Sequence, residues 1–357
     1  MNIAFVLPRM RNKSIGGYKM VYEYANRFTK MGHQVSIGYI SNKVGKEKAA
    51  QYHIPEWGRR LLAYPISEWR MSHYPTWFQL SPRVKQFCIY DLSEKIDEAD
   101  AIVATAFNTA EFVSKQHAPV LAYFIQGYET WDGVTKEEVH HTYQLGMRNI
   151  VITHWLENIV RQEAPGAFCA HVPNGLDLAV FHRDDKIKKE DHSVAMLYHD
   201  APYKGSVYGI ESLKILKRAY PDLKATLFGV PNRPSDLPDW ITYVKSANQE
   251  QLVDIYNRAA VYMYPTIQEG LGLTCIESMA CGCALAVSDY EAAHEFAVHE
   301  KTALLSPVRD PQAMAENVAR YFDDPEFRVR VAQEGMNTAK QFDWNLSVNK
   351  FLNVLKA

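Results

Sequence analysis

The 357-residue sequence has few cysteines and no long apolar run. Its five cysteines are scattered and form no Cys-x-x-Cys pair, which indicates a reducing compartment and argues against both a disulfide framework and a zinc site. No stretch approaches the roughly 18 apolar residues that a membrane-spanning helix needs. The N-terminus enters an apolar strand pattern directly, without the charged and then apolar leader of a signal peptide. We therefore expect a cytoplasmic protein.

The chain also lacks a strong net charge. The formal charge is −2, which excludes a protein that binds nucleic acid through its overall charge. The charge is nevertheless uneven, because residues 1–90 contain 14 Lys and Arg against 4 Asp and Glu, whereas the other residues contain 25 against 37. A basic N-terminal part predicts a local anionic partner, such as a phosphate, a lipid headgroup or an acidic polymer.

Short apolar segments alternate with amphipathic ones, which predicts parallel sheets covered by helices. The strands expected in the first half lie at 2–7, 34–39, 101–105, 120–125 and 149–152, with a helix at 18–31. The second half predicts strands at 194–198, 224–228, 261–264 and 284–287 and helices at 206–219, 249–260, 273–281, 312–322, 326–341 and 345–355. Between the halves, the charged run 183–192 is interpreted as a linker. The pattern predicts an α/β protein with two Rossmann-like domains whose strand C-terminal ends face a ligand cleft.

The segment from Pro265 to Gly282 carries the strongest chemical signal. It follows a predicted buried strand and enters a helix, whose free amides can hold a diphosphate. Glycines at 270 and 272 allow the backbone to approach a ligand closely. Glu269 precedes the helix and Glu277 lies inside it, so one carboxylate can reach a sugar and the other ribose hydroxyls. The alternative, an ordinary helix with two solvated glutamates, is disfavoured by the complete string.

This string resembles the Glu-x7-Glu motif of family 4 glycosyltransferases, which are retaining enzymes of the GT-B fold. Other segments match that family in the same order along nearly the whole chain. They are Gly16-Gly17 with Gly32-His33-Gln34-Val35, Pro173-Asn174-Gly175-Leu176-Asp177 followed by Phe181, Lys204-Gly205, and Phe342-Asp343-Trp344. The resemblance implies a GT-B fold with an acceptor-binding domain at 1–180 and a donor-binding domain at 181–340. A C-terminal helix within 341–357 would cross back to the first domain.

The resemblance also implies a donor site. Lys204 would bind the donor diphosphate and Glu269 would contact the transferred sugar, both as catalytic residues, while Glu277 would bind the ribose. The other donor-binding residues that it implies are Gly17, His199, Gly270, Leu271, Gly272, Leu273 and Thr274. The alternative for Lys204 is a surface lysine at a strand–helix turn, which the glycine after it disfavours.

Two positions depart from the family pattern. His199 stands where an arginine is usual, and histidine supplies a weaker, pH-dependent charge. Either activity falls as the pH rises, or Lys204 and helix amides hold the diphosphate. Gln126 stands where many relatives have histidine, and the Tyr-Phe-x-Gln-x-x-Glu pattern at 123–129 resembles a subgroup that contains bacterial rhamnosyltransferases. We expect Gln126 and Glu129 to bind the acceptor, although Glu129 is equally compatible with a turn cap.

The resemblance implies a retaining hexosyltransferase that moves a sugar from a nucleotide-diphosphate donor to a glycan or lipid-linked glycan in cell-surface polysaccharide synthesis. No Asp-x-Asp motif appears in a supporting context, so we expect no metal and no other cofactor. The alternative is a catalytically inactive GT-B partner subunit of a glycosyltransferase complex. A nicotinamide-dependent dehydrogenase is disfavoured, because no G-x-G-x-x-G follows either first strand.

The basic and aromatic region 43–87 is the candidate contact to the acceptor or to the inner face of the cell membrane. Its Lys43, Lys46, Lys48, Arg59, Arg60 and Arg70 accompany Trp57, Trp69 and Trp77. This combination suits an anionic leaflet. The alternative is a solvated face whose aromatic residues lie in the core. Cys281 and Cys283 are expected to be small buried residues, and no function is assigned to His140, His141, His294 or His299.

Overall fold

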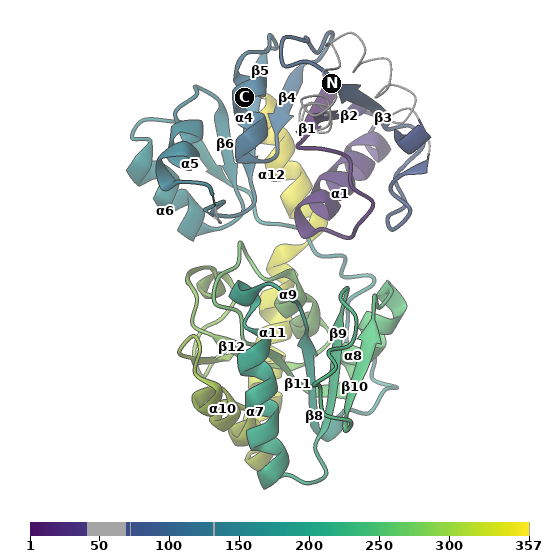
Figure 1. Cartoon of the computed structure of the whole chain (residues 1–357), viewed down its shortest axis with the longest axis vertical. Helices are drawn as coiled ribbons and strands as arrows, with labels where there is room; N and C mark the ends of the chain where they lie inside the picture. The colour runs from purple at the N-terminus through teal and green to yellow at the C-terminus, as the bar shows by residue number, and fades with distance from the viewer. Residues whose placement is uncertain (41–68, 72, 131–132, 357) are drawn as a thin grey trace. The chain divides into compact units, whose positions relative to one another are not determined.

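The computed structural model describes residues 1–40, 69–71, 73–130 and 133–356 (Figure 1). The chain divides into two compact units, one formed by Met1–Pro173 with Val348–Ala357 and the other by Asn174–Ser347. The domain bounds expected from the sequence fall after residues 180 and 340, whereas the two units divide after Pro173 and Ser347. Each unit is built around its own parallel sheet, as the alternation of strands and helices predicts.

The first unit contains a sheet of seven parallel strands in the order β3-β2-β1-β4-β5-β6-β7. The strands are β1 (Asn2–Leu7), β2 (Gln34–Ile40), β3 (Lys85–Ile89), β4 (Ala101–Ala104), β5 (Val120–Ile125), β6 (Arg148–Val151) and β7 (Cys169–His171). Its helices are α1 (Gly16–Lys30), α4 (Phe107–Ser114), α5 (Lys136–Tyr143) and α6 (His154–Glu163). The sequence predicts β1 and β5 with the observed bounds.

The second unit contains six parallel strands in the order β10-β9-β8-β11-β12-β13. They are β8 (Glu190–Leu197), β9 (Lys224–Gly229), β10 (Ile241–Lys245), β11 (Ala259–Tyr264), β12 (Ala284–Ser288) and β13 (Leu304–Ser306). The helices are α7 (Ser206–Ala219), α8 (Gln249–Arg258), α9 (Leu273–Ala280), α10 (Pro311–Asp323), α11 (Pro325–Ala339) and α12 (Trp344–Lys356), with short turns η1 (Pro202–Lys204), η2 (Glu291–Glu295) and η3 (Lys340–Phe342). The predicted α/β class with two parallel-sheet domains is thus confirmed.

The core of the second unit forms on both faces of its central strand β11. Val261 and Met263 point into one apolar cluster, which includes Leu213 of α7 and Val318 of α10. Tyr262, between them, points to the other face, where its ring lies 5.5 Å from that of Tyr256 on α8. This period of two, with both faces buried, is typical of a central parallel strand.

Helix α12 begins in the second unit, and its residues from Val348 onward belong to the first. Phe351 is fully buried and packs against Tyr24 and Phe124, at ring-centroid distances of 4.6 and 5.2 Å. At the start of the helix, the Trp344 ring covers Gly175, where a Cβ atom would lie 2.2 Å from that ring. Two motifs that resembled family elements, the Asn-Gly turn and the Phe-x-Trp segment, are therefore in direct contact.

The segment 183–192 is not a linker, which corrects the interpretation made from its charge. Arg183 donates to the Asn257 carbonyl at 3.2 Å, and Lys189 donates to the Ala259 carbonyl at 2.8 Å. Both carbonyls lie at the C-terminal end of α8, where cations stabilise the exposed ends of the helix. The charged side chains of this segment are thus part of the second unit.

In each sheet, the strand order reverses beside the first strand of the unit, between β1 and β4 and between β8 and β11. Open α/β sheets bind ligands outside the carboxyl ends of the strands at such a reversal. The topology therefore predicts a ligand site beside the residues that follow β8 and β11 in the second unit. Among the helices of the described ranges, none is both long and apolar enough to cross a membrane.

Candidate active site

Lys204 and Glu269 are brought together at the reversal point of the second sheet. Lys204 follows β8, Glu269 follows β11, and the lysine ammonium forms a direct ion pair with the carboxylate. Tyr264, the last residue of β11, donates its hydroxyl to the same carboxylate oxygen at 3.0 Å. The other oxygen accepts the backbone N–H of Gly270 at 3.2 Å. The two residues predicted to be catalytic thus form one polar group.

Gly205 allows the Lys204 turn to lie against the loop that carries Glu269. Its φ angle is +65°, and a Cβ atom there would lie 1.9 Å from the Pro265 carbonyl oxygen. The contact is closed by the Ile267 N–H, which donates to the Tyr203 carbonyl at 2.8 Å. A residue with a side chain would force the two loops apart, so the Lys-Gly pair has a steric reason.

Replacing Gly205 with alanine is expected to destabilise the second unit and to weaken its donor site. The matched control is Gly166→Ala, because Gly166 also has a positive φ angle, +84°, but nothing within 4 Å of its missing Cβ. Both variants carry the left-handed strain of about 1–2 kcal/mol, whereas Gly205→Ala adds an overpacking cost of about 1–3 kcal/mol. Urea unfolding measures the difference. Equal losses in the two variants would contradict the steric role.

Burial sets the charge state of Lys204. Its side chain is only 16% exposed, and this desolvation lowers the pKa of the ammonium to about 8. The lysine is therefore still charged at neutral pH and loses its proton as the pH rises past that value. The ion pair with Glu269 opposes the desolvation and keeps the cation in the site.

His199, unlike Lys204, is not a source of fixed positive charge in the unliganded protein. Partial burial of its ring and the charge of Lys204 lower its pKa below the ordinary value. Its Nδ1 accepts the Ala201 N–H at 2.9 Å, so the neutral ring carries its proton on Nε2. At pH 7, His199 therefore offers a hydrogen-bond donor, and the fixed positive charge in this part of the site belongs to Lys204.

The predicted phosphate-binding amides lie at the start of α9. Gly272 precedes the helix with a φ angle of +103°, and a Cβ atom there would lie 2.5 Å from the Tyr290 hydroxyl. Tyr290 donates to the Leu271 carbonyl at 2.8 Å and fixes the loop. No side chain in the described part of the chain caps this helix start, so the amides of Leu273 and Thr274 can bind an anion.

Glu277 is the fifth residue of α9 and is only 5% exposed. The Tyr256 hydroxyl donates to its carboxylate at 3.3 Å. A buried carboxylate needs such partners because desolvation penalises its charge. Tyr256, Tyr264 and Tyr290 were not predicted as site residues, although the place of Tyr264 at the end of a central strand was an available signal.

The predicted acceptor residues lie together in the first unit. Gln126, which follows β5, donates its side-chain amide to the Gly17 carbonyl at 3.2 Å. Gly17 therefore lies beside Gln126, and its role in donor binding stays a prediction. The Glu129 carboxylate accepts the Phe107 N–H at 2.6 Å and the Tyr123 hydroxyl at 3.0 Å. Glu129 thus holds the start of α4, as in the cap alternative, and burial raises its pKa to about 7.

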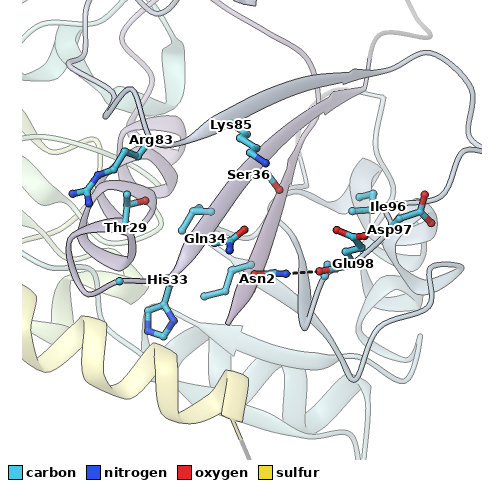
Figure 2. A pocket seen from close by; sticks show the side chains of 14 residues that line it. Asn2, Thr29, His33, Gln34, Ser36, Arg83, Lys85, Ile96, Asp97 and Glu98 are labelled. Atoms are coloured by element: carbon cyan, nitrogen blue, oxygen red, sulfur yellow. Dashed lines mark hydrogen bonds between the residues drawn. The ribbon is translucent and has the colours of Figure 1, made fainter.

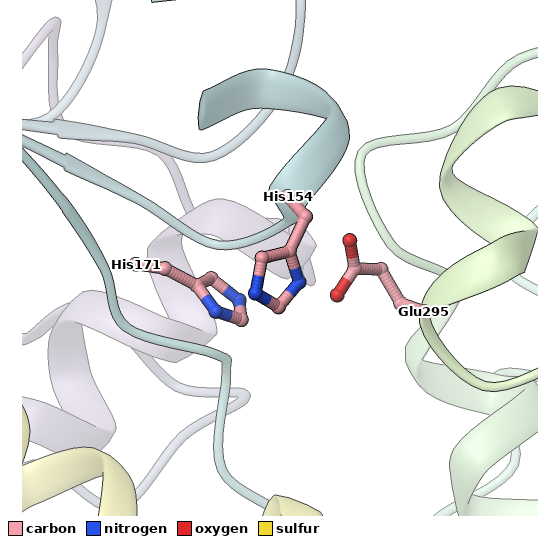
Figure 3. Close-up of side chains that lie close together, drawn as sticks. All are labelled: His154, His171 and Glu295. Carbon is pink, nitrogen blue, oxygen red and sulfur yellow. The ribbon is translucent and has the colours of Figure 1, made fainter. Parts of the chain in front are cut away.

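Histidines of the first unit form contacts that the sequence did not predict. His140 contacts Tyr128 and Glu163, at 2.8 and 3.1 Å. His154, at the start of α6, and His171, in β7, lie with ring centroids 3.9 Å apart (Figure 3). The sequence could not predict these contacts, because they join elements that come together only in the folded first unit.

A cavity of about 380 Å³ lies elsewhere in the first unit (Figure 2). It is lined by Asn2, Gln34 and Lys85, which begin β1, β2 and β3, and by the loop before β4. Since ligands of open α/β sheets bind at the carboxyl ends of the strands, this cavity is at the opposite edge from the one expected. We assign it no role.

The basic and aromatic region 43–87 lies largely outside the described residues, including Lys43, Lys46, Lys48, Trp57, Arg59 and Arg60. Of the described tryptophans, Trp69 is 52% exposed, whereas Trp77 packs on Tyr22 at 5.7 Å. The exposed Trp69 ring fits a contact surface, whereas the packed Trp77 ring fits the alternative in which the aromatic residues lie in the core. Cys281 and Cys283 are buried, as predicted.

Comparison with known proteins agrees with this geometry. Residues 179–338 match the family described as "Glycosyl transferases group 1". A phosphatidyl-myo-inositol mannosyltransferase of Mycolicibacterium smegmatis is 24% identical over 205 residues, which cover 54% of this chain and 53% of that protein. An O-antigen chain mannosyltransferase B of Escherichia coli is 28% identical over 117 residues, covering 33% of this chain and 30% of that protein. The chain spans about half the length of the curated relatives it matches, or less.

The similarity in structure extends over the whole chain. A sucrose-phosphate synthase of Thermosynechococcus elongatus superposes with a TM-score of 0.76 at 16% identity, covering 99% of this chain and 98% of the other. Anabaena Alr3699/HepE, solved with UDP and glucose, gives 0.73 at 14% identity and covers 100% and 99%. The fold is therefore that of the GT-B proteins. Residues 179–338 resemble the group 1 glycosyltransferases, and this match covers somewhat less than half of the chain.

Proposed function

We propose that the protein is a retaining glycosyltransferase, which moves a hexose from a nucleoside diphosphate to a glycan or lipid-linked glycan acceptor. The observation that carries the proposal is the Lys204–Glu269 pair at the strand-order reversal of the second sheet. The uncapped start of α9 follows it in the chain, and Glu277 lies further along the same helix. This combination offers a cation and amides to a diphosphate and carboxylates to sugar hydroxyls.

Donor binding would exchange the partners of the ion pair. In the unliganded protein, Lys204 and Glu269 neutralise each other. A donor diphosphate would take over the ammonium and release the carboxylate, which keeps its bonds from Tyr264 and Gly270. The released carboxylate can then accept hydrogen bonds from the sugar, so phosphate and sugar are recognised in one step.

In the proposed reaction, the bond between the anomeric carbon and the donor diphosphate breaks while the acceptor oxygen bonds to the same face of that carbon. The leaving phosphate oxygen takes the acceptor proton, and no second protein carboxylate is needed for this step. The protein contributes mainly electrostatic stabilisation, because Lys204 and the α9 amides lie where the phosphate charge develops. His199 would add a hydrogen bond from Nε2. We propose that these groups replace a metal ion.

The acceptor class is supported by the relatives, whose names include a mannosyltransferase for phosphatidyl-myo-inositol and one for an O-antigen chain. Both names describe transfer of a mannose. The loop after β1 fits an anionic acceptor, since Arg9, Arg11 and Lys13 are all exposed there. We therefore propose a role in cell-surface polysaccharide or glycolipid synthesis at the inner face of the membrane.

A panel of UDP, GDP, TDP and ADP, each with and without EDTA, tests the donor site. At about 100 times the Kd, one selected nucleotide is expected to stabilise the protein by about 2.7 kcal/mol, visible as a rise in Tm. A rise that survives EDTA supports a metal-independent donor site and identifies the base. Loss of the rise with EDTA contradicts metal independence. No rise with any of the four contradicts the proposed transfer and favours an inactive partner subunit.

A further inference from the structure

The loop that follows β5 is held by a chain of three polar side chains. The Tyr128 hydroxyl lies 2.8 Å from His140 Nε2, and His140 Nδ1 lies 3.1 Å from a carboxylate oxygen of Glu163. A carboxylate only accepts, so Nδ1 carries a proton, and in the neutral ring Nε2 accepts from the tyrosine. The loop is thereby connected to α5 through His140 and to the end of α6 through Glu163.

This chain fixes an aromatic surface that remains partly exposed. One contact of the Tyr128 ring is with His140, at 5.8 Å between centroids and 23° between planes. Trp155 meets Tyr128 nearly at a right angle, at 6.0 Å and 78°. Neither Tyr128 nor Trp155 is fully buried. The exposed parts of the two rings are therefore open to a ligand.

The position of the two rings relates them to the predicted acceptor site. Tyr128 lies two residues beyond Gln126 and follows the C-terminal end of β5, while Trp155 follows the end of the neighbouring β6. Ligands of open α/β sheets lie at this edge. The rings of the tyrosine and the tryptophan match the C–H face of a pyranose, and the indole N–H of Trp155 can donate to one of its hydroxyls.

We propose that Tyr128 and Trp155 form a binding surface for a pyranose ring of the acceptor. His140 and Glu163 are positioning residues, which act by holding the tyrosine in the orientation that the sugar needs. The inference rests on the proposed function for the identity of the ligand as an acceptor, but the surface itself lies entirely within the first unit. It would add a sugar contact to the one predicted for Gln126.

The test uses four short acceptors, the octyl glycosides of glucose, galactose, mannose and N-acetylglucosamine, with the donor base that the nucleotide panel selects. Tyr128→Ala and Trp155→Ala are expected to raise the acceptor KM about tenfold and to leave the donor KM unchanged, since each removes one aromatic contact. Tyr128→Phe keeps the ring and should cost about threefold. His140→Ala should raise the acceptor KM about fivefold, and His140→Gln, which can bond both neighbours, should restore it.

The chain provides a matched control in His141→Ala. His141 is next to His140 on α5 and also contacts a carboxylate, that of Glu111 at 2.9 Å, but its side chain is 60% exposed. This variant should keep the wild-type acceptor KM. A fall in Tm alone, with the acceptor KM unchanged in Tyr128→Ala and Trp155→Ala, would mean that the three side chains only stabilise the loop and would overturn the inference.

Equilibrium binding of the same octyl glycosides, without donor, separates this inference from the proposed function. If wild type binds a glycoside and Tyr128→Ala does not, the sugar surface is supported. If wild type also transfers no sugar, that second result counts against the proposed transferase activity and leaves the sugar surface supported. Equal binding by wild type and Tyr128→Ala, or no binding of any of the four glycosides by wild type, would overturn the inference while sugar transfer to another acceptor stood.

Discussion

Lys204→Ala is expected to lower kcat by about 100- to 1,000-fold, because it removes a buried charge from the position where the leaving diphosphate becomes more negative. The fold should survive the change. Glu269 would keep its hydrogen bonds from Tyr264 and Gly270, and its side chain is 24% exposed, so it is not left as an isolated buried charge. Steady-state transfer with the selected donor measures the loss, and a thermal melt measures the stability.

The control for this variant is Lys214→Ala. Lys214 also forms an ion pair with a glutamate, Glu211 at 2.8 Å, but on the exposed surface of α7. Its removal should change neither kcat nor Tm. Wild-type turnover in Lys204→Ala would exclude the lysine from leaving-group stabilisation and leave that role to the α9 amides.

The same lysine predicts the alkaline limb of the pH profile. Burial lowers the pKa of Lys204 in the free protein to about 8, so the lysine is charged and active well below this pH and loses its charge as the pH rises through it. Since kcat/KM reports the free enzyme, it should fall above about pH 8. The limb in kcat should lie higher, because a bound diphosphate stabilises the ammonium. In Lys204→Arg, the limb in kcat/KM should disappear, whatever activity that variant retains.

Glu277→Gln is expected to weaken binding of the selected nucleoside diphosphate by about 10- to 100-fold, since hydrogen bonds to a charged group contribute about 1.5–3 kcal/mol each. The amide has the same shape as the carboxylate and can still accept from Tyr256, so the buried site should remain folded. Isothermal titration of the nucleotide measures the affinity, and Glu211→Gln on the exposed face of α7 is the control, expected to bind like wild type.

The assignment of Glu277 to the ribose has a more direct test. The 2′-deoxy and 3′-deoxy forms of the nucleotide should bind the wild-type protein more weakly than the ribonucleotide. Glu277→Gln should lose most of this discrimination, because the partner of the hydroxyl has already been weakened. A variant that discriminates as strongly as wild type would assign the ribose to another residue.

Much of the fold could be predicted because its central strands are continuous apolar runs. The pattern gave β1, β5 and α7 with the observed bounds. The edge strands β7 and β13, three residues each, are too short to produce a pattern, and β10 is exposed on several positions. The charged segment 183–192 was misread because its cations bind carbonyls at the end of α8, and sequence composition contains no information on such partners.

The sequence identified several residues of the site but not how they are arranged in space. Lys204 and Glu269 were both identified, yet their pairing depends on β8 and β11 being neighbours, which only the strand order determines. The roles of Tyr264 and Tyr290 depend on loop positions in the same way. Tyr128 and His140 are twelve residues apart on different elements, so their contact needed the folded first unit.

The packing of Phe351 has a consequence for the order of events during synthesis. The core of the first unit includes a ring that lies 351 residues along the chain, after the whole of the second unit. Every residue of the second unit, which is continuous in sequence, is therefore synthesised before Phe351 is available to the first unit. The first unit begins the chain, yet it is the last to have all of its core residues available. Before Phe351 is added, its place beside Tyr24 and Phe124 is unfilled.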